Sequence, residues 1–357
     1  MRILHFISSA ASGGAEVYVK DLAKMLVLQG HSVGIVFLDR ASENGRSEEY
    51  ESHFIQDLNN TGVDTFFIGS KARKRLWFGR TQVRGILNRY KPDLIHCHLY
   101  YAILFCAGFD YKLVYTHHSN RLRLPKLAYR IIDKFVDAYI GICLDAKNLL
   151  HQASGKPVHL IDNAVDKTRL VERSERIDDH ESVRLFAVGR LTEQKNYYRL
   201  LDALTQIDSS LHWSLNIAGE GRLRDELEEY KNTLNLADKV SFLGNVSNIP
   251  EYLGSSDVFV MSSDWEGLPI ALIEATLSGL AVVVTNVGGC AEVVHKSLNG
   301  LVVDELTVDS FADALNRIVS DIELRKQFQK NSLKYSTDYL LEISVERHVS
   351  LYRSLVK

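Results

Sequence analysis

The sequence predicts an α/β protein with two Rossmann-like domains, each built on a parallel sheet. A chain of 357 residues is long enough for about two domains with separate cores. Short apolar segments alternate with helical stretches, which is typical of βαβ units and doubly wound sheets. In the first half the expected strands are residues 3–7, 33–38, 65–68, 94–98, 113–116 and 139–143. The second half repeats the rhythm in the segments WSLNIAGEG, VSFLGNV and DVFVMSS.

The composition is that of an ordinary soluble globular protein, with 46% hydrophobic residues, 24% charged residues and a net charge of −3. This balance gives no reason to expect a nucleic-acid partner. Four scattered cysteines without a Cys-x-x-Cys pair favour a reduced, cytoplasmic compartment. The apolar start of the chain reads as a strand leading into a glycine turn, not as a signal peptide. No stretch approaches the roughly 20 apolar residues of a membrane span.

The charge pattern divides the chain. Residues 167–182 are highly charged and lack apolar periodicity, so we expect a linker there. It would separate an N-terminal domain, residues 1–166, from a C-terminal domain, residues 183–340. Residues 341–357 then form a long amphipathic helix.

Two glutamates, Glu266 and Glu274, lie in the segment 264–289. Pro269 is expected at the first position of a helix and Gly279 at its C-terminal cap. Glu266 then precedes the helix, and Glu274 lies about a turn and a half inside it. A helix N-terminus attracts an anion such as a diphosphate, and a carboxylate can accept hydrogen bonds from a vicinal diol. The pair therefore suits a nucleotide sugar; the alternative is two ordinary solvated side chains.

Further polar groups stand at expected strand ends. Arg190 follows a strand and Lys195 precedes the next helix, at the edge where open α/β sheets bind ligands. Gly13 and Gly14 form a turn before the first helix, where backbone N–H groups can approach a ligand. The turn is not the dinucleotide fingerprint Gly-x-Gly-x-x-Gly.

Histidines mark the ends of two neighbouring strands. Side chains alternate along a strand, so His96 and His98 share one face, and His117 and His118 end the next strand. A zinc site would require a third ligand at a recognisable spacing, which the sequence does not show. Packed or hydrogen-bonded strand histidines explain His96 and His98 equally well.

The segment 264–289 resembles the signature of the retaining family 4 glycosyltransferases of the GT-B fold, the type that makes bacterial polysaccharide and lipopolysaccharide. That signature is a glutamate, Gly-x-Pro, a second glutamate followed by alanine, a glycine and a valine-rich strand. His118 matches the family's histidine after a Thr-x step. Residues 163–166 resemble its Asn-Gly-Val-Asp, with Ala164 in place of the usual glycine.

The resemblance implies two Rossmann-like domains that face an interdomain cleft, with the donor held mainly by the C-terminal domain and the acceptor by the N-terminal one. It also implies that the helix 341–357 returns toward the first domain. The reaction would transfer a sugar from a nucleotide-diphospho-sugar to a hydroxyl group with retention of configuration. Rival readings are a nucleotide-sugar epimerase or hydrolase on the same fold, and a non-catalytic nucleotide-sugar-binding protein.

The resemblance also implies roles for individual residues. Its catalytic set is His118, which contacts the donor sugar without acting as a general base, Glu266, Arg190 and Lys195. Its nucleotide-sugar-binding set is Gly13, Gly14, Arg190, Lys195, Asn245, Val246, Asn248, Gly267, Leu268 and Glu274. No Asp-x-Asp occurs in the sequence, so we expect no metal and no cofactor. Charge-assisted hydrogen bonds of about 1.5–3 kcal/mol each would stabilise the leaving diphosphate instead.

The resemblance implies that residues 243–248 line the base pocket, and the polar side chains of this segment are Asn245, Ser247 and Asn248. Guanine presents paired N–H donors that suit a carboxylate, and this segment carries none. The sequence therefore favours a uridine diphosphate sugar.

Two basic segments of the N-terminal domain predict a membrane surface. Residues 71–80 combine five basic side chains with Leu76, Trp77 and Phe78. Residues 121–135 place cations four residues apart beside Leu127 and its apolar neighbours. Such stripes suit an anionic bilayer, although an amphipathic helix usually packs its apolar face on its own sheet. We expect a peripheral enzyme on the inner face of the cytoplasmic membrane, acting on a lipid-linked glycan.

Overall fold

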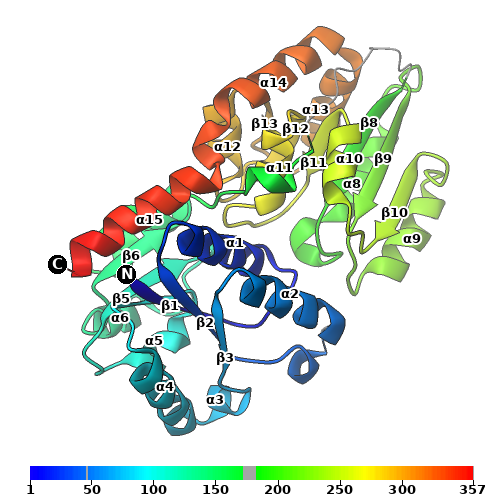
Figure 1. Ribbon diagram of the computed structural model, residues 1–357. Helices are drawn as coiled ribbons and strands as arrows, with labels where there is room; N and C mark the ends of the chain where they lie inside the picture. The colour runs from blue at the N-terminus through cyan, green and yellow to red at the C-terminus, as the bar shows by residue number, and fades with distance from the viewer. Residues whose placement is uncertain (46, 172–181, 357) are drawn as a thin grey trace. The chain divides into compact units, whose positions relative to one another are not determined.

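The computed structural model describes residues 1–45, 47–171 and 182–356 (Figure 1). The chain divides into two compact units. The first contains Met1–Ala164 together with Leu341–Lys357, and the second contains Val165–Leu340. Most of the predicted linker, residues 172–181, lies outside the described residues.

The first unit is built on a seven-stranded sheet with the order β3-β2-β1-β4-β5-β6-β7. All its strand pairs are parallel. The strands are β1 Arg2–Ile7, β2 Ser32–Phe37, β3 Asp64–Phe67, β4 Leu94–Cys97, β5 Lys112–His117, β6 Ala138–Gly141 and β7 Val158–Leu160. Chain order reverses between β1 and β4, so this sheet has a topological switch point there. The register places His5 of β1 beside His96 of β4.

Helices cover both faces of this sheet. Successive residues of its central strands, which point to opposite faces, are therefore all buried. They are α1 Gly14–Leu28, η1 Ser42–Asn44, α2 Glu48–Asn60, α3 Lys71–Lys74, α4 Leu76–Tyr90, α5 Tyr100–Cys106, α6 Lys126–Ile132, α7 Leu144–Ala153 and α15 Leu341–Val356. The last helix, α15, packs against α1, and the Tyr18 hydroxyl lies 2.7 Å from Ser344 Oγ. None of the described helices is both long and apolar enough to cross a bilayer.

The second unit is built on a six-stranded parallel sheet with the order β10-β9-β8-β11-β12-β13. Its strands are β8 Val183–Val188, β9 Trp213–Ala218, β10 Val240–Gly244, β11 Val258–Met261, β12 Ala281–Thr285 and β13 Gly300–Val303. Its helices are η2 Lys167–Arg169, η3 Glu193–Lys195, α8 Tyr197–Thr205, α9 Arg224–Thr233, α10 Ile249–Ser255, α11 Ile270–Leu277, α12 Cys290–Ser297, α13 Val308–Ser320, α14 Ile322–Tyr335 and η4 Thr337–Tyr339. The switch point lies between β8 and β11.

The prediction of an α/β fold with two Rossmann-like domains is confirmed. The sequence did not indicate the edge strands β7 and β13, which have three and four residues. Strands this short carry too little alternation or apolar run to stand out.

The helix α11 begins and ends close to the predicted positions. Pro269 is its N-cap, one position earlier than predicted, since Ile270 is the first helical residue. At the other end Gly279 has a φ of +78°. Its N–H donates to Thr276 O at 3.0 Å, and the next N–H, of Leu280, donates to Ala275 O at 3.1 Å. These bonds form the Schellman motif that left-handed glycine permits.

We predict that Gly279→Ala lowers the stability of the protein by about 1–2 kcal/mol, because a Cβ strains the left-handed backbone. That Cβ would also lie 2.9 Å from Leu333 Cδ2. A fall in the midpoint of urea denaturation measures the loss. The matched control is Gly254→Ala in the same unit, where the nearest atom is Val171 Cγ1 at 3.7 Å. Equal midpoints for the two variants would contradict the role given to the cap.

Candidate active site

In the second unit, polar side chains gather where β8, β11 and β12 end. Glycine allows the loops of this edge to approach one another. A Cβ on Gly288, whose φ is +54°, would lie 2.3 Å from Glu266 O and 2.6 Å from Gly267 O. The Gly289 N–H donates to Gly267 O at 2.7 Å. The loop after β12 thus fixes the backbone that leads into α11.

The Glu266 carboxylate is held by three side chains. Its Oε1 accepts hydrogen bonds from Lys195 Nζ at 2.7 Å and Ser263 Oγ at 2.8 Å. Its Oε2 accepts a weaker one from Gln194 Nε2 at 3.3 Å. Glu266 is 7% exposed and Glu274 is 9% exposed, so the alternative that both are ordinary solvated residues is wrong.

The Lys195 side chain reaches Glu266 because the segment around it is fastened to the loop after β11. Asn196 has a left-handed φ of +42°, and its Nδ2 donates to Asp264 Oδ1 at 3.1 Å. Arg199 binds the same carboxylate at 2.7 Å. Gly189 makes room for the ammonium chain, since a Cβ there would lie 2.6 Å from Lys195 Cε. The predicted pair of Lys195 and Glu266 is therefore in direct contact.

Arg190 follows β8 and is exposed. Within the described part of the chain, its guanidinium makes no hydrogen bond or ion pair. The predicted phosphate-binding arginine is thus open to an anion at the carboxyl edge of the sheet.

Glu274 lies inside α11 and has a partner that the sequence did not reveal. Arg169 donates to Glu274 Oε1 at 2.6 Å. Arg169 ends η2, which Asp166 caps by accepting a hydrogen bond from the Thr168 N–H at 2.8 Å. The arginine belongs to the charged stretch assigned to the linker, where one cation among many gave no signal. Ser263 and Gln194 were likewise missed, because serine and glutamine beside a motif are common.

Gly267 and Leu268 join Glu266 to α11, whose first-turn N–H groups have no partner within the helix. The Glu266 carboxylate and these donors together form one polar edge. It combines an anion cradle with a fixed acceptor for a hydroxyl group.

The segment 243–248 lies at the end of β10, with Asn245 exposed and Val246 partly buried. The segment carries no carboxylate, but the fold places two beside it. A Cβ on Gly244 would lie 2.9 Å from Glu220 Oε1, and Asn248 Nδ2 donates to Glu251 Oε2 at 2.8 Å. The sequence argument against guanine counted only the segment's own side chains and did not include these two neighbours, so the preference for uridine stays a prediction.

In the first unit, Gly13 is the N-cap of α1, with Gly14 its first helical residue. Glu16 folds back over the turn, and a Cβ on Gly13 would lie 2.2 Å from Glu16 Oε2. Glu16 Oε1 accepts a hydrogen bond from Ser8 Oγ at 2.6 Å. A side chain at position 13 would require the Glu16 carboxylate to move.

The histidines of the first unit form a hydrogen-bonded cluster. His98 lies 2.9 Å from His118 and 3.1 Å from His5, measured between ring nitrogens. His96 contacts the Tyr352 hydroxyl at 2.6 Å and Thr116 Oγ1 at 2.7 Å. Burial lowers the pKa of His118 to about 3, so its ring is neutral at neutral pH. His96 and His98 are therefore hydrogen-bonded strand histidines.

His5 is the member of this cluster that the sequence missed. Nitrogens of His5, His96 and His98 lie within 4.8 Å of one another, so a third nitrogen is present that motif spacing did not show. Its partners lie in β4 and directly after it, and the register of β1 against β4 brings the three histidines together.

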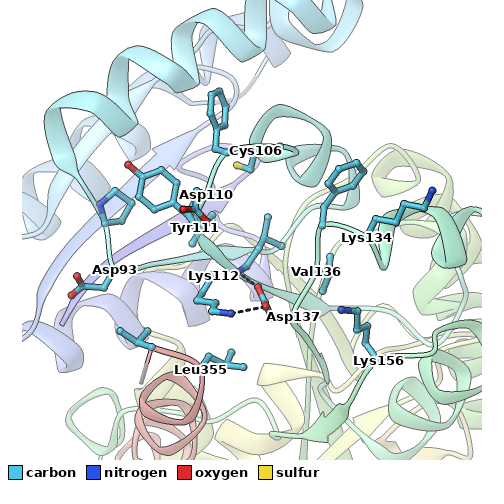
Figure 2. A pocket seen from close by; sticks show the side chains of 17 residues that line it. Asp93, Cys106, Asp110, Tyr111, Lys112, Lys134, Val136, Asp137, Lys156 and Leu355 are labelled. Carbon is cyan, nitrogen blue, oxygen red and sulfur yellow. Dashed lines mark hydrogen bonds and ion pairs between the residues drawn. The ribbon is translucent and has the colours of Figure 1, made fainter.

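A separate cavity of about 590 Å³ lies at the opposite edge of the first unit's sheet. It is lined by residues that precede or begin β4 to β7, and Figure 2 shows Lys112 bonded to Asp137 there. Ligands of open α/β sheets bind outside the carboxyl ends of the strands. The predicted site residues accordingly lie at carboxyl ends of strands, and none of them lines this cavity.

Comparison with known proteins gives the family. Residues 12–169 match the family profile Glycosyltransferase Family 4, and residues 170–335 match Glycosyl transferases group 1. The amylovoran biosynthesis glycosyltransferase AmsD of Erwinia amylovora is 34% identical over 82% of this chain and 79% of its own. UDP-Gal:alpha-D-GlcNAc-diphosphoundecaprenol alpha-1,3-galactosyltransferase of Escherichia coli is 28% identical over 86% of this chain and 88% of its own.

A solved structure supports the fold. HepE of Anabaena, crystallised in complex with UDP, superimposes with a TM-score of 0.81 at 21% identity. The superposition covers 99% of this chain and 100% of HepE. With two Rossmann-like domains, both family profiles and a relative at 34% identity in agreement, the chain belongs to the family 4 glycosyltransferases of the GT-B fold.

Proposed function

We propose that this protein is a retaining, metal-independent hexosyltransferase that transfers a sugar from a UDP-sugar to a hydroxyl group of a lipid-linked glycan. The pathway is cell-surface polysaccharide biosynthesis, on the cytoplasmic face of the membrane. The observation that carries the proposal is the buried Glu266 carboxylate, fixed by Lys195 in front of the α11 N-terminus. Retention of configuration follows from the family resemblance.

The hydrogen bonds of Glu266 define its part in the reaction. A carboxylate offers about four lone-pair sites. Lys195, Ser263 and Gln194 occupy two on Oε1 and one on Oε2. One acceptor site on Oε2 is left for a hydroxyl group of the transferred sugar. Glu266 therefore accepts from a single sugar hydroxyl and not from a diol.

The diphosphate requires positive charge as its bond to the sugar breaks. The Lys195 ammonium has three N–H donors and spends one on Glu266, so two are left for phosphate oxygens. The exposed Arg190 and the first-turn N–H groups of α11 add further donors. Charge-assisted hydrogen bonds are worth about 1.5–3 kcal/mol each, so this set replaces a metal ion.

Glu274 is the acceptor for the ribose hydroxyls. Arg169 orients its carboxylate within the first two turns of α11. We propose uridine as the base of the donor. This choice rests on the ligands of related proteins and not on the polar residues of segment 243–248. HepE was crystallised with UDP and with UDP-glucose, and the Escherichia coli relative is named for UDP-Gal.

The membrane surface is formed by apolar side chains that the fold leaves exposed. On α6, Leu127 is 74% exposed and Ile131 is 56% exposed, while Tyr129 and Ile132 are buried. The alternative that the apolar stripe of this helix packs on its own sheet is therefore wrong. The helix is shorter than the predicted stretch 121–135, and Lys134 and Phe135 follow it.

The segment 71–80 contributes less charge than the sequence indicated. Arg73 binds the buried carboxylate of Asp39, and Arg80 donates to Ala107 O at 2.6 Å. Phe78 is partly buried and packs against the core. Trp77 is 80% exposed, and the cations left for lipid headgroups are Lys71, Lys74 and Arg75. Near an anionic bilayer each contributes about 1 kcal/mol.

The central test supplies UDP-sugars, GDP-sugars and an undecaprenyl-diphosphate-linked sugar acceptor in excess chelator. We expect acceptor-dependent release of UDP, with the anomeric configuration of the donor kept in the product, as read by proton NMR. Calorimetry should give tighter binding of UDP than of GDP. Loss of turnover on chelation, restored by a divalent ion, would contradict metal independence. Tight binding without turnover would identify a binding protein instead.

The site residues predict separable kinetic effects. Glu266→Gln should lower kcat by about 100-fold, because a fixed acceptor at the reacting sugar is lost. Glu274→Ala should weaken UDP binding by about tenfold with a smaller change in kcat, since it removes a charged hydrogen bond. Lys195→Ala should lose several kcal/mol of transition-state stabilisation. Glu228→Ala, on exposed α9, is the control; kinetics like this control for both Glu266 and Glu274 variants would refute the assignment.

Sedimentation with anionic vesicles tests the membrane surface. The wild type should pellet at low salt, and a variant with Lys71, Lys74 and Arg75 changed to glutamine should stay in the supernatant. Leu127→Ser combined with Ile131→Ser should also lose binding. The control changes Lys326, Lys330 and Lys334 of α14, which removes the same charge elsewhere. If the first variant pellets like this control, these cations do not bind the membrane and the proposed membrane surface is wrong.

A further inference from the structure

Three histidines of the first unit form a single file of hydrogen bonds. His118 Nε2 lies 2.9 Å from His98 Nδ1, and His98 Nε2 lies 3.1 Å from His5 Nδ1. The two nitrogens at the ends of the file, His118 Nδ1 and His5 Nε2, are buried and have no hydrogen-bond partner in the part of the chain that the structure describes. The file thus begins at the predicted sugar-binding histidine and ends in the core.

Hydrogen-bond chemistry couples the tautomers of the three rings. Each contact between nitrogens requires one N–H and one lone pair. Burial lowers the pKa of His5 and His118 to about 3 and that of His98 well below its ordinary value, so all three rings are neutral at neutral pH. A neutral ring carries one N–H, and therefore only two arrangements satisfy both contacts.

In the first arrangement every ring carries its proton on Nδ1. His5 then donates to His98, His98 donates to His118, and His118 Nδ1–H is left as the free donor. In the second arrangement every proton is on Nε2, the bonds run in reverse, and His5 Nε2–H is left without an acceptor. Both arrangements make two hydrogen bonds, so the unpaired ends decide between them.

The two end nitrogens, His5 Nε2 and His118 Nδ1, differ in whether a substrate can supply a hydrogen-bond acceptor. His5 is 0% exposed, so an N–H on its Nε2 is buried without an acceptor. Orphaned donors are rarer in proteins than under-satisfied acceptors, and each unpaired buried group costs about 1–3 kcal/mol. The first arrangement leaves only a lone pair on His5 and moves the unpaired N–H to His118, where a hydroxyl oxygen of a substrate can accept it.

We propose that His98 and His5 are positioning residues that hold His118 as its Nδ1–H tautomer, so that His118 donates a hydrogen bond to a hydroxyl oxygen of the donor sugar. This role rests on the proposed glycosyltransferase function, because the bound sugar hydroxyl is the acceptor that favours this arrangement over the reverse one. The proton is on His118 Nδ1 because His5 and His98 also carry their protons on Nδ1, so both hydrogen bonds run from His5 toward His118. As a neutral donor, His118 cannot also act as a general base through that nitrogen.

A metal is a weaker explanation of the same cluster. His96 has both of its ring nitrogens in hydrogen bonds, to the Tyr352 and Thr116 hydroxyls. Both nitrogens of His98 are likewise used by its two neighbours in the file. Ligation would have to break at least two of these contacts.

The tautomer is measurable apart from turnover, by long-range proton–nitrogen NMR on the full chain labelled with ¹⁵N-histidine and saturated with a UDP-sugar. With the UDP-sugar bound, we expect His118 to show a protonated Nδ1 and a bare Nε2. In His98→Leu, which fills a similar space without a hydrogen-bonding group, the Nε2–H form of His118 should appear under the same conditions. An Nε2–H tautomer in the wild type with the UDP-sugar bound, or no change in His98→Leu, would overturn the proposal.

Kinetics then test the consequence. We expect His98→Leu to lower kcat/KM for the sugar donor about tenfold, the worth of one hydrogen bond. His98→Gln, which can both donate and accept, should recover most of it. The same comparison is then made with a series of donor sugars that each lack one hydroxyl group. For the sugar that lacks the hydroxyl contacted by His118, His98→Leu should lower kcat/KM no further than the missing hydroxyl already does in the wild type. An equal loss with every donor would mean a structural defect and would overturn the proposal, with thermal melting reporting whether each variant folds.

The two levels of inference fail differently. If the wild type binds a nucleotide sugar but does not turn it over, the proposed function is wrong, and the NMR result still decides the tautomer. If turnover is normal and His118 carries its proton on Nε2, the function stands and the positioning role is wrong.

Discussion

The ion pair between Lys195 and Glu266 joins the segment after β8 to the loop after β11. Both side chains are largely buried, with 15% and 8% of their surface exposed. A buried pair of this kind is costly to break, since removing one partner leaves an uncompensated charge at a penalty of about 3–5 kcal/mol. The contact therefore fixes the position of both groups before any substrate arrives. The same loop continues into α11, so the anion cradle is fixed with respect to the carboxylate.

Around that pair the second unit repeats one device. Each of the two glutamates of the signature is oriented by a side chain outside the signature: Glu266 by Ser263, and Glu274 by Arg169. Gly288 allows a loop to approach the backbone of Glu266 closely. Preorganised groups of this kind need little rearrangement when charge develops on a ligand. The proposed chemistry therefore depends on these supporting residues as well as on those of the signature.

In the first unit, neutral side chains orient one another through hydrogen bonds. Its histidines are buried and uncharged, and hydrogen bonds orient them without adding charge to the site. Elsewhere on this unit the surface is charged, and the apolar side chains of Trp77 and Leu127 are exposed among cations. Exposed apolar side chains surrounded by cations are the observation on which the proposal of an anionic membrane surface rests.

The sequence by itself determined the two-domain α/β fold, the start and end of α11 and the family, because these depend on local signals. Strand and helix periods, caps and a contiguous motif are all properties of neighbouring residues. It also placed Lys195 and Glu266 at adjacent sheet edges, since parallel strands end at one side. It failed where partners come from distant elements: Arg169 with Glu274, and Glu220 beside Gly244.

Tertiary structure decided which side chains are free and which are already paired. The sequence could not distinguish Arg73, which binds buried Asp39, from Lys74, which is exposed, because both are cations in one short run. Nor could it place His5 behind His98, since that contact depends on the register of β1 against β4. Charge and apolar pattern are local properties of the sequence, whereas hydrogen-bond partners depend on three-dimensional position: Arg169 and Glu274 are 105 residues apart in the chain, and His96 and Tyr352 are 256 apart.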